Sequence, residues 1–212
     1  MLVNLIIFDL DGTLIDSTQG LYDTLNELLT KNNFDRITLE EFKGILGTPL
    51  QNVFAELLDK NPADCFEYVK QFRKIYPQYA TCELKDGAQE LLRFLKEKKK
   101  NITLATVKSE RMTTKILNDT RIIQYFDFIT TSPNSEQDYS KDFLINTVLN
   151  KYEINKEEIV MIGDTIHDII GAKSNGIKGI GIVNDFCTRK EFEEVNADII
   201  VDSLKELENI LK

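Results

Sequence analysis

The sequence has few of the residues that form covalent cross-links or sites for soft metals. Its 212 residues include three cysteines, Cys65, Cys82 and Cys187, and a single histidine, His167. The cysteines are odd in number, far apart and without a C-x-x-C pair, so disulfides and a zinc site are both disfavoured. We expect all three cysteines to be buried or half-buried structural thiols.

Long hydrophobic runs are also missing. No apolar stretch approaches the roughly 20 residues that a membrane-spanning helix requires. The apolar start of the chain is short, lacks a basic leading segment and soon reaches Asp9, so it does not resemble a signal peptide. These features predict a cytoplasmic protein that does not act on a membrane.

Positive charge is in deficit. The chain has 26 basic against 35 acidic residues, a formal net charge of -9. This balance opposes binding to nucleic acids and anionic membranes. The basic cluster at residues 96–100 ends an amphipathic segment, where cations complement the helix dipole, and a solvated helix end explains it better than a nucleic-acid site. We therefore expect neither a nucleic-acid nor a membrane partner.

Short and nearly continuous apolar runs indicate the fold class. Such runs are typical of strands that are buried on both faces, as in a parallel sheet. They occur at residues 2–8, 102–106, 126–130, 159–162, 179–183 and 199–201. Helical patterns separate most of them, at residues 88–98, 111–118, 143–152 and 166–174. This alternation predicts an α/β fold with a doubly wound, mostly parallel, Rossmann-like sheet, and its active site at the carboxyl ends of the strands.

One segment breaks the alternation. Residues from about 17 to 79 contain helical patterns without a convincing strand. We therefore expect two domains, a catalytic core of residues 1–15 and 81–212 and an inserted all-helical cap of residues 16–80. The cap aromatics are expected to form its core rather than a substrate box; they are Phe54, Phe66, Tyr68, Phe72 and Tyr76.

Two acidic residues follow the first predicted strand. Asp9 and Asp11 are two positions apart, so their side chains leave the strand end in the same direction. Gly12 lets the backbone turn and approach a ligand closely. Two carboxylates this close are costly unless a cation or a proton relieves them. The pair alone has an alternative explanation, because Asp-Gly is also a common turn.

A second acidic pair follows another strand. Asp164 comes directly after the run 159–162, and Asp168 lies one helical turn later. Asp164 alone could be a helix N-cap. That alternative does not explain four acids at two strand ends. Carboxylates together with backbone carbonyls and waters form a hard oxygen site that suits Mg²⁺.

Groups that could bind phosphate follow other strands. Thr106 ends the run 102–106, and its hydroxyl together with nearby backbone amides, such as that of Val107, could bind phosphate oxygens. Lys141 precedes the next helical pattern and could supply a point charge. The structural alternatives are a strand-favouring threonine and a solvated lysine.

These motifs together resemble the haloacid dehalogenase-like hydrolases. The segment 9–14 resembles the family's first motif, and the segment 163–168 resembles the fourth, of the form GDxxxD. Thr106 matches the second motif and Lys141 the third by position, although Asp142 stands where the family usually has proline. The nearest branch is the phosphoglycolate phosphatase-like one with a small helical cap.

The resemblance implies a role for each site residue. Asp9 would be the nucleophile that forms an aspartyl-phosphate, and Asp11 the general acid and base. Thr106, Val107 and Lys141 would bind the phosphoryl group. The ligands of Mg²⁺ would be Asp9, Asp164 and the Asp11 carbonyl, with Asp168 acting directly or through water. A cap loop facing the substrate would include Gly47, Thr48 and Gln51.

The function that the resemblance implies is Mg²⁺-dependent hydrolysis of a small phosphate monoester, phosphoglycolate-like or related. The expected partner is a small phosphorylated metabolite, bound by a monomer or homodimer. The alternatives are a sugar phosphomutase of the β-phosphoglucomutase type, a pyrophosphatase or a nucleotidase. A non-catalytic binding module is disfavoured, because a degenerate member of the family would be expected to lose Asp9 or a metal ligand. His167 lies in the variable part of the fourth motif, and we expect it to be solvent-facing or structural.

Overall fold

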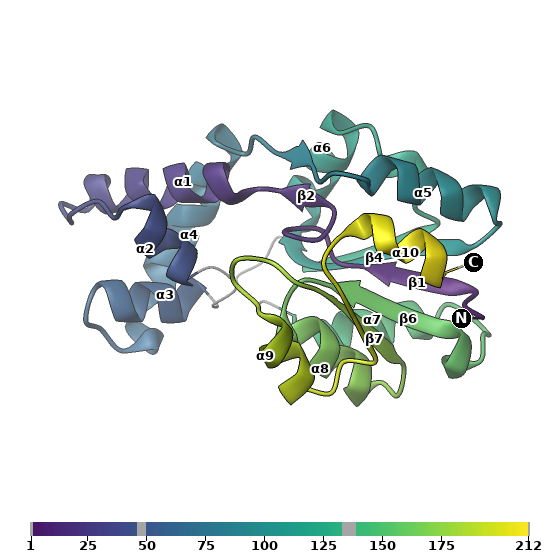
Figure 1. Ribbon diagram of the computed structural model, residues 1–212. Helices are drawn as coiled ribbons and strands as arrows, with labels where there is room; N and C mark the ends of the chain where they lie inside the picture. Colours follow the sequence, from purple (N-terminus) through teal and green to yellow (C-terminus); the bar gives the residue numbers. More distant parts are fainter. Residues whose placement is uncertain (1, 46–49, 133–138, 212) are drawn as a thin grey trace. The chain divides into compact units, whose positions relative to one another are not determined.

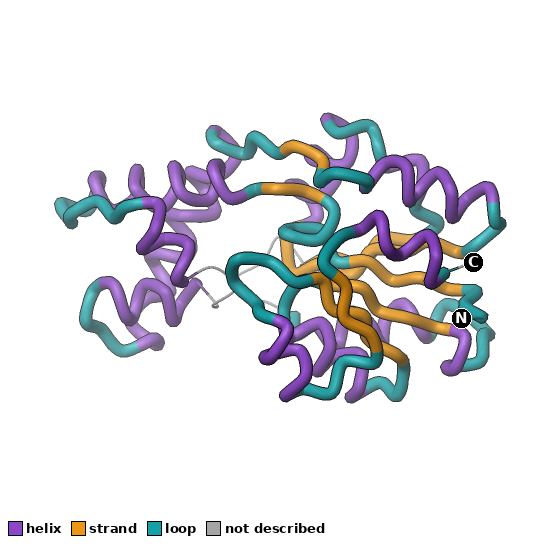
Figure 2. The backbone as a smooth tube through the Cα atoms, viewed as in Figure 1, coloured by secondary structure: helices purple, strands orange, loops and turns teal. Residues whose placement is uncertain are grey.

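The computed structural model describes residues 2–45, 50–132 and 139–211. The chain divides into two compact units. One contains Met1–Asp16 and Glu83–Lys212, and the other is Ser17–Cys82. Figure 2 shows that strands are concentrated in the first unit and that the second is built of helices and loops.

The larger unit contains a six-stranded parallel sheet. Its strand order is β5-β4-β1-β6-β7-β8, with β1 near the centre (Figure 1). The strands are β1 (Leu5–Phe8), β4 (Asn101–Ser109), β5 (Phe128–Ser132), β6 (Ile159–Gly163), β7 (Lys178–Ile182) and β8 (Ile199–Val201). Each strand overlaps one of the six apolar runs from which it was predicted, although β1 begins only at Leu5 and β4 continues to Ser109. The doubly wound α/β prediction is confirmed.

Helices cover both faces of this sheet (Figure 1). Helices α5, α6 and α10 lie on one side, and α7, α8 and α9 on the other. Their bounds are α5 (Ala88–Glu97), α6 (Glu110–Asp119), α7 (Lys141–Leu149), α8 (Ile166–Ser174), α9 (Arg189–Glu194) and α10 (Leu204–Ile210). Short 3₁₀ segments are η3 (Ile123–Tyr125) and η4 (Lys156–Glu158).

The core forms where helices α7 and α8 pack on the sheet. Leu144, Ile145 and Val148 of α7 contact Leu5 and Ile7 of β1 in one buried cluster. Burial of these apolar side chains stabilises the layer by roughly 1.5–3 kcal/mol for each of the larger ones. This packing fixes the position of β1 relative to α7 and α8, the helices that carry site residues.

Strand register brings the site residues to one edge. Phe8 of β1 is level with Leu104 of β4 on one side and with Ile162 of β6 on the other. The backbone N–H of Asp9 donates to the carbonyl of Ile162 at 2.9 Å. Because all these strands run in the same direction, the residues that follow them meet at the carboxyl edge of the sheet.

Some elements were not predicted from the sequence. A two-residue antiparallel pair joins β2 (Ile15–Asp16) to β3 (Glu83–Leu84), where the chain leaves and re-enters the larger unit. Helices α9 and α10 were missed as well. Strands of two residues are too short to show any periodicity, and both helices are only six or seven residues long.

The smaller unit is helical, as its sequence pattern indicates. It contains α1 (Thr18–Lys31), α2 (Leu39–Ile45), α3 (Leu50–Leu57), η1 (Pro62–Cys65), α4 (Phe66–Ile75) and η2 (Tyr76–Gln78). Phe54, Phe72 and Tyr76 are buried, and Phe54 and Phe72 pack edge to face with ring centroids 6.3 Å apart. These three rings lie in the core of the unit, as expected, whereas Phe66 and Tyr68 are only half-buried.

None of the three cysteines, all of which lie in the described part of the chain, forms a disulfide; Cys65 and Cys187 are buried and Cys82 is half-buried. This agrees with their interpretation as structural thiols. Among the residues described, no helix combines the length and the apolar character needed to cross a membrane.

Candidate active site

The loop after β1 places Asp9 and Asp11 at the sheet edge. Asp9 is buried and Asp11 is half-buried. Gly12 follows with φ +75°, in the left-handed region that favours glycine. A Cβ at Gly12 would lie 2.0 Å from Asp164 Oδ2, so only glycine lets this loop pass so close to the second acidic segment. Lys85 Nζ donates to the Gly12 carbonyl at 2.8 Å and holds the loop from the other side.

The segment between β6 and α8 supplies the second pair of acids. Thr165 is the N-cap of α8 and forms a capping box with Asp168. Asp168 Oδ2 accepts hydrogen bonds from the Thr165 backbone N–H at 3.1 Å and from its hydroxyl at 2.9 Å. The N-cap alternative for Asp164 is therefore wrong, because the neighbouring threonine caps the helix and Asp164 faces the site.

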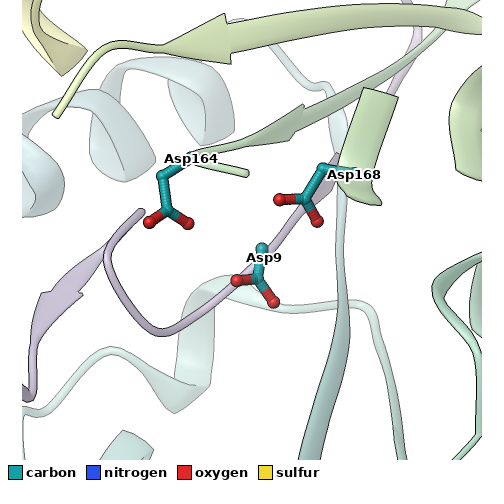
Figure 3. A group of neighbouring side chains, drawn as sticks. All are labelled: Asp9, Asp164 and Asp168. Atoms are coloured by element: carbon teal, nitrogen blue, oxygen red, sulfur yellow. The ribbon is translucent and has the colours of Figure 1, made fainter. Parts of the chain in front are cut away.

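Three carboxylates gather at this edge of the sheet. Asp9, Asp164 and Asp168 are all buried, and each offers an oxygen within 4.8 Å of the others. Figure 3 shows Asp9 at the end of its strand, with Asp164 and Asp168 arranged around the same space. A Cβ at Gly163 would lie 2.1 Å from Asp168 Cγ, so this packing also requires glycine.

Lys141 provides positive charge to the cluster from the first turn of α7. Its buried Nζ lies 2.6 Å from Asp9 Oδ1, 2.9 Å from Asp168 Oδ1 and 3.0 Å from the carbonyl of Ala105. Burial acts to lower the pKa of Lys141, but the ion pairs with Asp168 and Asp9 outweigh it and raise the pKa above the usual lysine value. Lys141 is therefore a fixed ammonium at the centre of the site.

The single positive charge of Lys141 does not neutralise the three clustered carboxylates. Burial, together with the charge of Asp168, raises the pKa of Asp9 to about 6 even though Lys141 opposes the shift. Burial and the charges of Asp9 and Asp168 raise the pKa of Asp164 well above its usual value. Asp168 Oδ1 is buried and forms an ion pair with Lys141. Among the described residues it accepts no hydrogen bond of good geometry.

The donor set of the cluster fits a hard divalent cation. It consists of carboxylate oxygens without sulfur or imidazole, which is the preference of Mg²⁺. Burial and mutual repulsion raise the pKa values of Asp9 and Asp164, and a divalent cation would relieve the repulsion.

The end of β4 supplies the residues predicted to bind phosphate. Thr106 is buried, and its hydroxyl accepts a hydrogen bond from the Lys108 backbone N–H at 3.3 Å. Val107 is 49% exposed, so its side chain does not belong to the core. Lys108 Nζ lies 3.2 Å from Asp11 Oδ1 in an ion pair that the sequence did not assign. The available signal was a lysine two residues beyond a strand-end threonine.

The other residues discussed from the sequence are His167 and three predicted cap-loop positions. His167 is exposed, which agrees with the expectation of a solvent-facing side chain. Gly47 and Thr48 lie outside the described residues, and Gln51 is exposed on α3. The assignment of these three to a cap substrate loop stays a prediction.

With this geometry established, comparisons with known proteins identify the family. The family model described as haloacid dehalogenase-like hydrolase matches residues 6–182. The chain belongs to this family. The matched residues include Asp9, Thr106, Lys141 and Asp168.

The similar proteins include a nucleotidase, a pyrophosphatase and a phosphatase. A 5'-nucleotidase from Pseudomonas aeruginosa is 29% identical over 188 residues, covering 88% of this chain and 85% of the relative. A pyrophosphatase PpaX from Bacillus mycoides is 23% identical and covers 100% of this chain and 98% of the relative. A phosphoglycolate phosphatase from Vibrio parahaemolyticus is 24% identical, with 97% and 94% covered.

A solved structure with a phosphatase description is also similar to this chain. The crystal structure from Clostridium acetobutylicum described as a predicted phosphatase superposes with a TM-score of 0.89 at 27% identity. It covers 99% of this chain and 98% of that one. This haloacid dehalogenase-like hydrolase is a phosphatase enzyme.

Proposed function

We propose that this phosphatase is Mg²⁺-dependent and hydrolyses a small phosphate monoester through an aspartyl-phosphate on Asp9. The observation that carries the proposal is the buried cluster of Asp9, Asp164 and Asp168 beside Lys141. Such a cluster repels a phosphate dianion unless a cation is present. The proposal therefore requires the metal for substrate binding as well as for chemistry.

Mg²⁺ would be held by the carboxylates of Asp9 and Asp164 and the backbone carbonyl of Asp11. Asp168 would support it either directly or through water. When bound, the ion neutralises charge on the phosphoryl oxygens and orients the group for attack. The structural support for this ligand set is the mutual approach of the three carboxylates and the raised pKa values of Asp9 and Asp164.

Asp9 would attack first. One carboxylate oxygen of Asp9 forms a bond to phosphorus, and the bond from phosphorus to the leaving oxygen breaks. Asp11 gives its proton to that leaving oxygen, so an alcohol departs and an acyl phosphate remains. In the second step Asp11 takes a proton from water, whose oxygen bonds to phosphorus. Inorganic phosphate leaves and Asp9 is regenerated as a carboxylate.

The phosphoryl group would be bound by Thr106, Val107 and Lys141. The Thr106 hydroxyl and the Val107 backbone amide are hydrogen-bond donors at the end of β4. Lys141, which contacts Asp9 at 2.6 Å, holds positive charge beside the nucleophile. Such preorganised donors stabilise the charge of the transferring group without reorganisation during the reaction.

We further propose that residues 16–80 form a cap that selects substrates by contacting the leaving group. Gly47, Thr48 and Gln51 would face the substrate. The enzyme would act in the cytoplasm. The resemblance to small-cap members of the family supports this arrangement. A substitution at Gln51 is then expected to change substrate preference more than the intrinsic rate.

A panel of phosphorylated compounds assayed with Mg²⁺ tests the substrate class. It would contain phosphoglycolate, nucleoside 5'-monophosphates, pyrophosphate and glucose 1-phosphate, matching the names of the relatives and the mutase alternative. Release of inorganic phosphate from monoesters with the highest kcat/KM supports the proposal. A preference for pyrophosphate would show that the substrate is a phosphoanhydride and not a monoester. Conversion of glucose 1-phosphate into an isomeric sugar phosphate would show that the enzyme is a mutase.

A further inference from the structure

The loop after β7 contains a residue that the reaction outlined above does not use. Asn184 is half-buried between β7 and α9. Its side-chain Nδ2 donates to Asp164 Oδ2 at 2.9 Å and to the Asp164 backbone carbonyl at 3.1 Å. The two residues are twenty positions apart in sequence. Asn184 thus contacts one of the three clustered carboxylates directly.

The loop itself determines which end of the Asn184 amide faces Asp164. The Oδ1 of Asn184 accepts hydrogen bonds from the backbone N–H groups of Phe186 and Cys187, both at 2.7 Å. A flipped amide would place its NH₂ against these two donors and its oxygen against a carboxylate. Four favourable contacts would become repulsive, so the hydrogen-bond network fixes the donor toward Asp164.

The far end of this loop is anchored in a small core. Cys187 is buried and packs with Ile169 of α8 and Phe192 of α9. Burial and the nearby Glu191 raise the pKa of the Cys187 thiol to about 11, which keeps it neutral and chemically quiet. The loop is therefore a fixed support from which the Asn184 amide is presented.

Asp164 is then held at both oxygens by neutral donors. The Thr13 hydroxyl donates to Oδ1 at 2.9 Å, and Asn184 donates to Oδ2 at the same distance. Neutral donors orient a carboxylate without cancelling its charge, and each carboxylate oxygen retains a further lone pair. The orientation of Asp164 is thereby set before any cation binds.

We propose that Asn184 is a positioning residue that holds Asp164 in the geometry needed to bind Mg²⁺. The inference rests on the proposed metal dependence. Partners that orient metal ligands typically contribute 10- to 100-fold to metal affinity. A purely structural asparagine would need only its oxygen for the turn, whereas here the amide end points at the carboxylate.

Asn184→Ser separates these two contributions. A serine hydroxyl can still accept from the N–H two residues along and support the turn, but it is too short to reach Asp164. Asn155→Ser is the matched control. Asn155 accepts from the backbone N–H of Glu157 at 3.1 Å in a similar turn at an exposed position.

Calorimetric titration of the substrate-free protein with Mg²⁺ measures the effect. We expect Asn184→Ser to raise the Kd for Mg²⁺ by about tenfold, with Asn155→Ser unchanged. The thermal midpoints of the two variants in EDTA should agree. The Mg²⁺ concentration for half-maximal hydrolysis of p-nitrophenyl phosphate should shift with the Kd, while kcat at saturating Mg²⁺ falls much less.

The outcomes distinguish this inference from the function on which it rests. If the wild type binds no Mg²⁺, the proposed metal dependence fails and the inference fails with it. If the wild type binds Mg²⁺ and Asn184→Ser binds equally well, the inference alone is overturned. A loss of metal-free stability in Asn184→Ser well beyond that in the control would assign Asn184 a structural role and also overturn it.

Discussion

At the scale of single residues, the two strand-end carboxylates of the first motif are in different environments. Asp9 is buried against Lys141 Nζ, whereas Asp11 is half-buried beside Lys108 Nζ. The proposed nucleophile is thus enclosed and oriented, while the proposed acid and base remains accessible to the leaving group and to water. The proposed division of labour predicts different defects for the two amide variants.

Asp9→Asn should abolish the phosphoenzyme, because an amide is a poor nucleophile. Asp11→Asn should retain the nucleophile and lose general acid–base catalysis, which typically contributes about 10²–10⁴-fold. With p-nitrophenyl phosphate the leaving group needs little protonation, so the acyl phosphate should accumulate in Asp11→Asn. Intact-mass measurement after acid quench would detect it. Near wild-type turnover by Asp9→Asn would exclude covalent catalysis by this residue.

The raised pKa of Asp9 predicts how stability changes with pH. Because the pKa of Asp9 is about 6 in the folded protein against an ordinary aspartate value of 3.8, the folded state binds more protons between these values. Stability of the metal-free protein should therefore fall as pH rises from about 4 to 6, by up to roughly 3 kcal/mol from this group.

Urea unfolding in EDTA at a series of pH values would measure this dependence. Asp9→Asn should lose the corresponding slope, since the amide does not titrate. Wild type and Asp9→Asn showing the same slope through this window would contradict the assignment of the effect to Asp9.

Close packing at Gly163 gives a further residue-scale prediction. A Cβ there would approach Asp168 Cγ to 2.1 Å, so Gly163→Ala must displace either β6 or the carboxylate. We expect a loss of about 1–3 kcal/mol in unfolding free energy, together with a weaker response of activity to Mg²⁺. Gly44→Ala, where a Cβ meets nothing within 4 Å, is the control. Equal stability of the two variants would contradict the clash.

At the scale of elements, the packing of α7 against α8 positions Lys141. Asn175, just beyond the end of α8, donates through Nδ2 to the carbonyl of Asp142 at 3.0 Å and to that of Gly171 at 2.9 Å. A Cβ at Gly171 would lie 3.1 Å from Lys141 Cγ, so the helices approach closely at the first turn of α7. This asparagine constrains the turn in which Asp142 replaces the family's usual proline.

Asn175→Ala should therefore affect stability and activity together. Leaving a buried carbonyl without its donor costs about 1–3 kcal/mol. Loosening the first turn of α7 should also lower kcat, because Lys141 is carried there. Asn118→Ala, which removes an exposed hydrogen bond to the carbonyl of Thr114, is the control for losing an asparagine at a helix end. If Asn175→Ala is destabilised but keeps the wild-type kcat, this packing does not position Lys141 for catalysis, and the prediction is wrong.

At the scale of the whole molecule, metal binding and folding should be linked. In the cluster, Asp9 follows β1, Asp164 follows β6 and Asp168 lies in α8, so unfolding would separate them. A cation that binds only the folded protein stabilises it by about 2.7 kcal/mol at a hundredfold excess over its Kd. The larger unit, which contains all three, should respond as a unit.

Removing the metal tests that linkage and the proposed mechanism together. In EDTA, hydrolysis should stop and the thermal midpoint should fall; added Mg²⁺ should restore both. Asp164→Asn should respond much less to Mg²⁺ in either measurement. Full activity after exhaustive metal removal would overturn the proposed mechanism.

The sequence determined the sheet and the identity of the acidic residues. Strands buried on both faces are continuous apolar runs, so their number along the chain and their approximate bounds could be read directly. Since parallel strands end at one edge, Asp9 and Asp164 could also be expected to meet there. The structure places both in the cluster, with Asp168 and Lys141.

Tertiary structure alone decided the contacts that surround those acids. The ion pair of Lys108 with Asp11 and the hydrogen bond of Asn184 to Asp164 depend on register, loop conformation and side-chain direction. Neither contact leaves a periodic or spaced pattern, because the partners are joined by folding and not by neighbouring positions in the chain. Short elements such as β2 and β3 are likewise defined by the partner with which they pair.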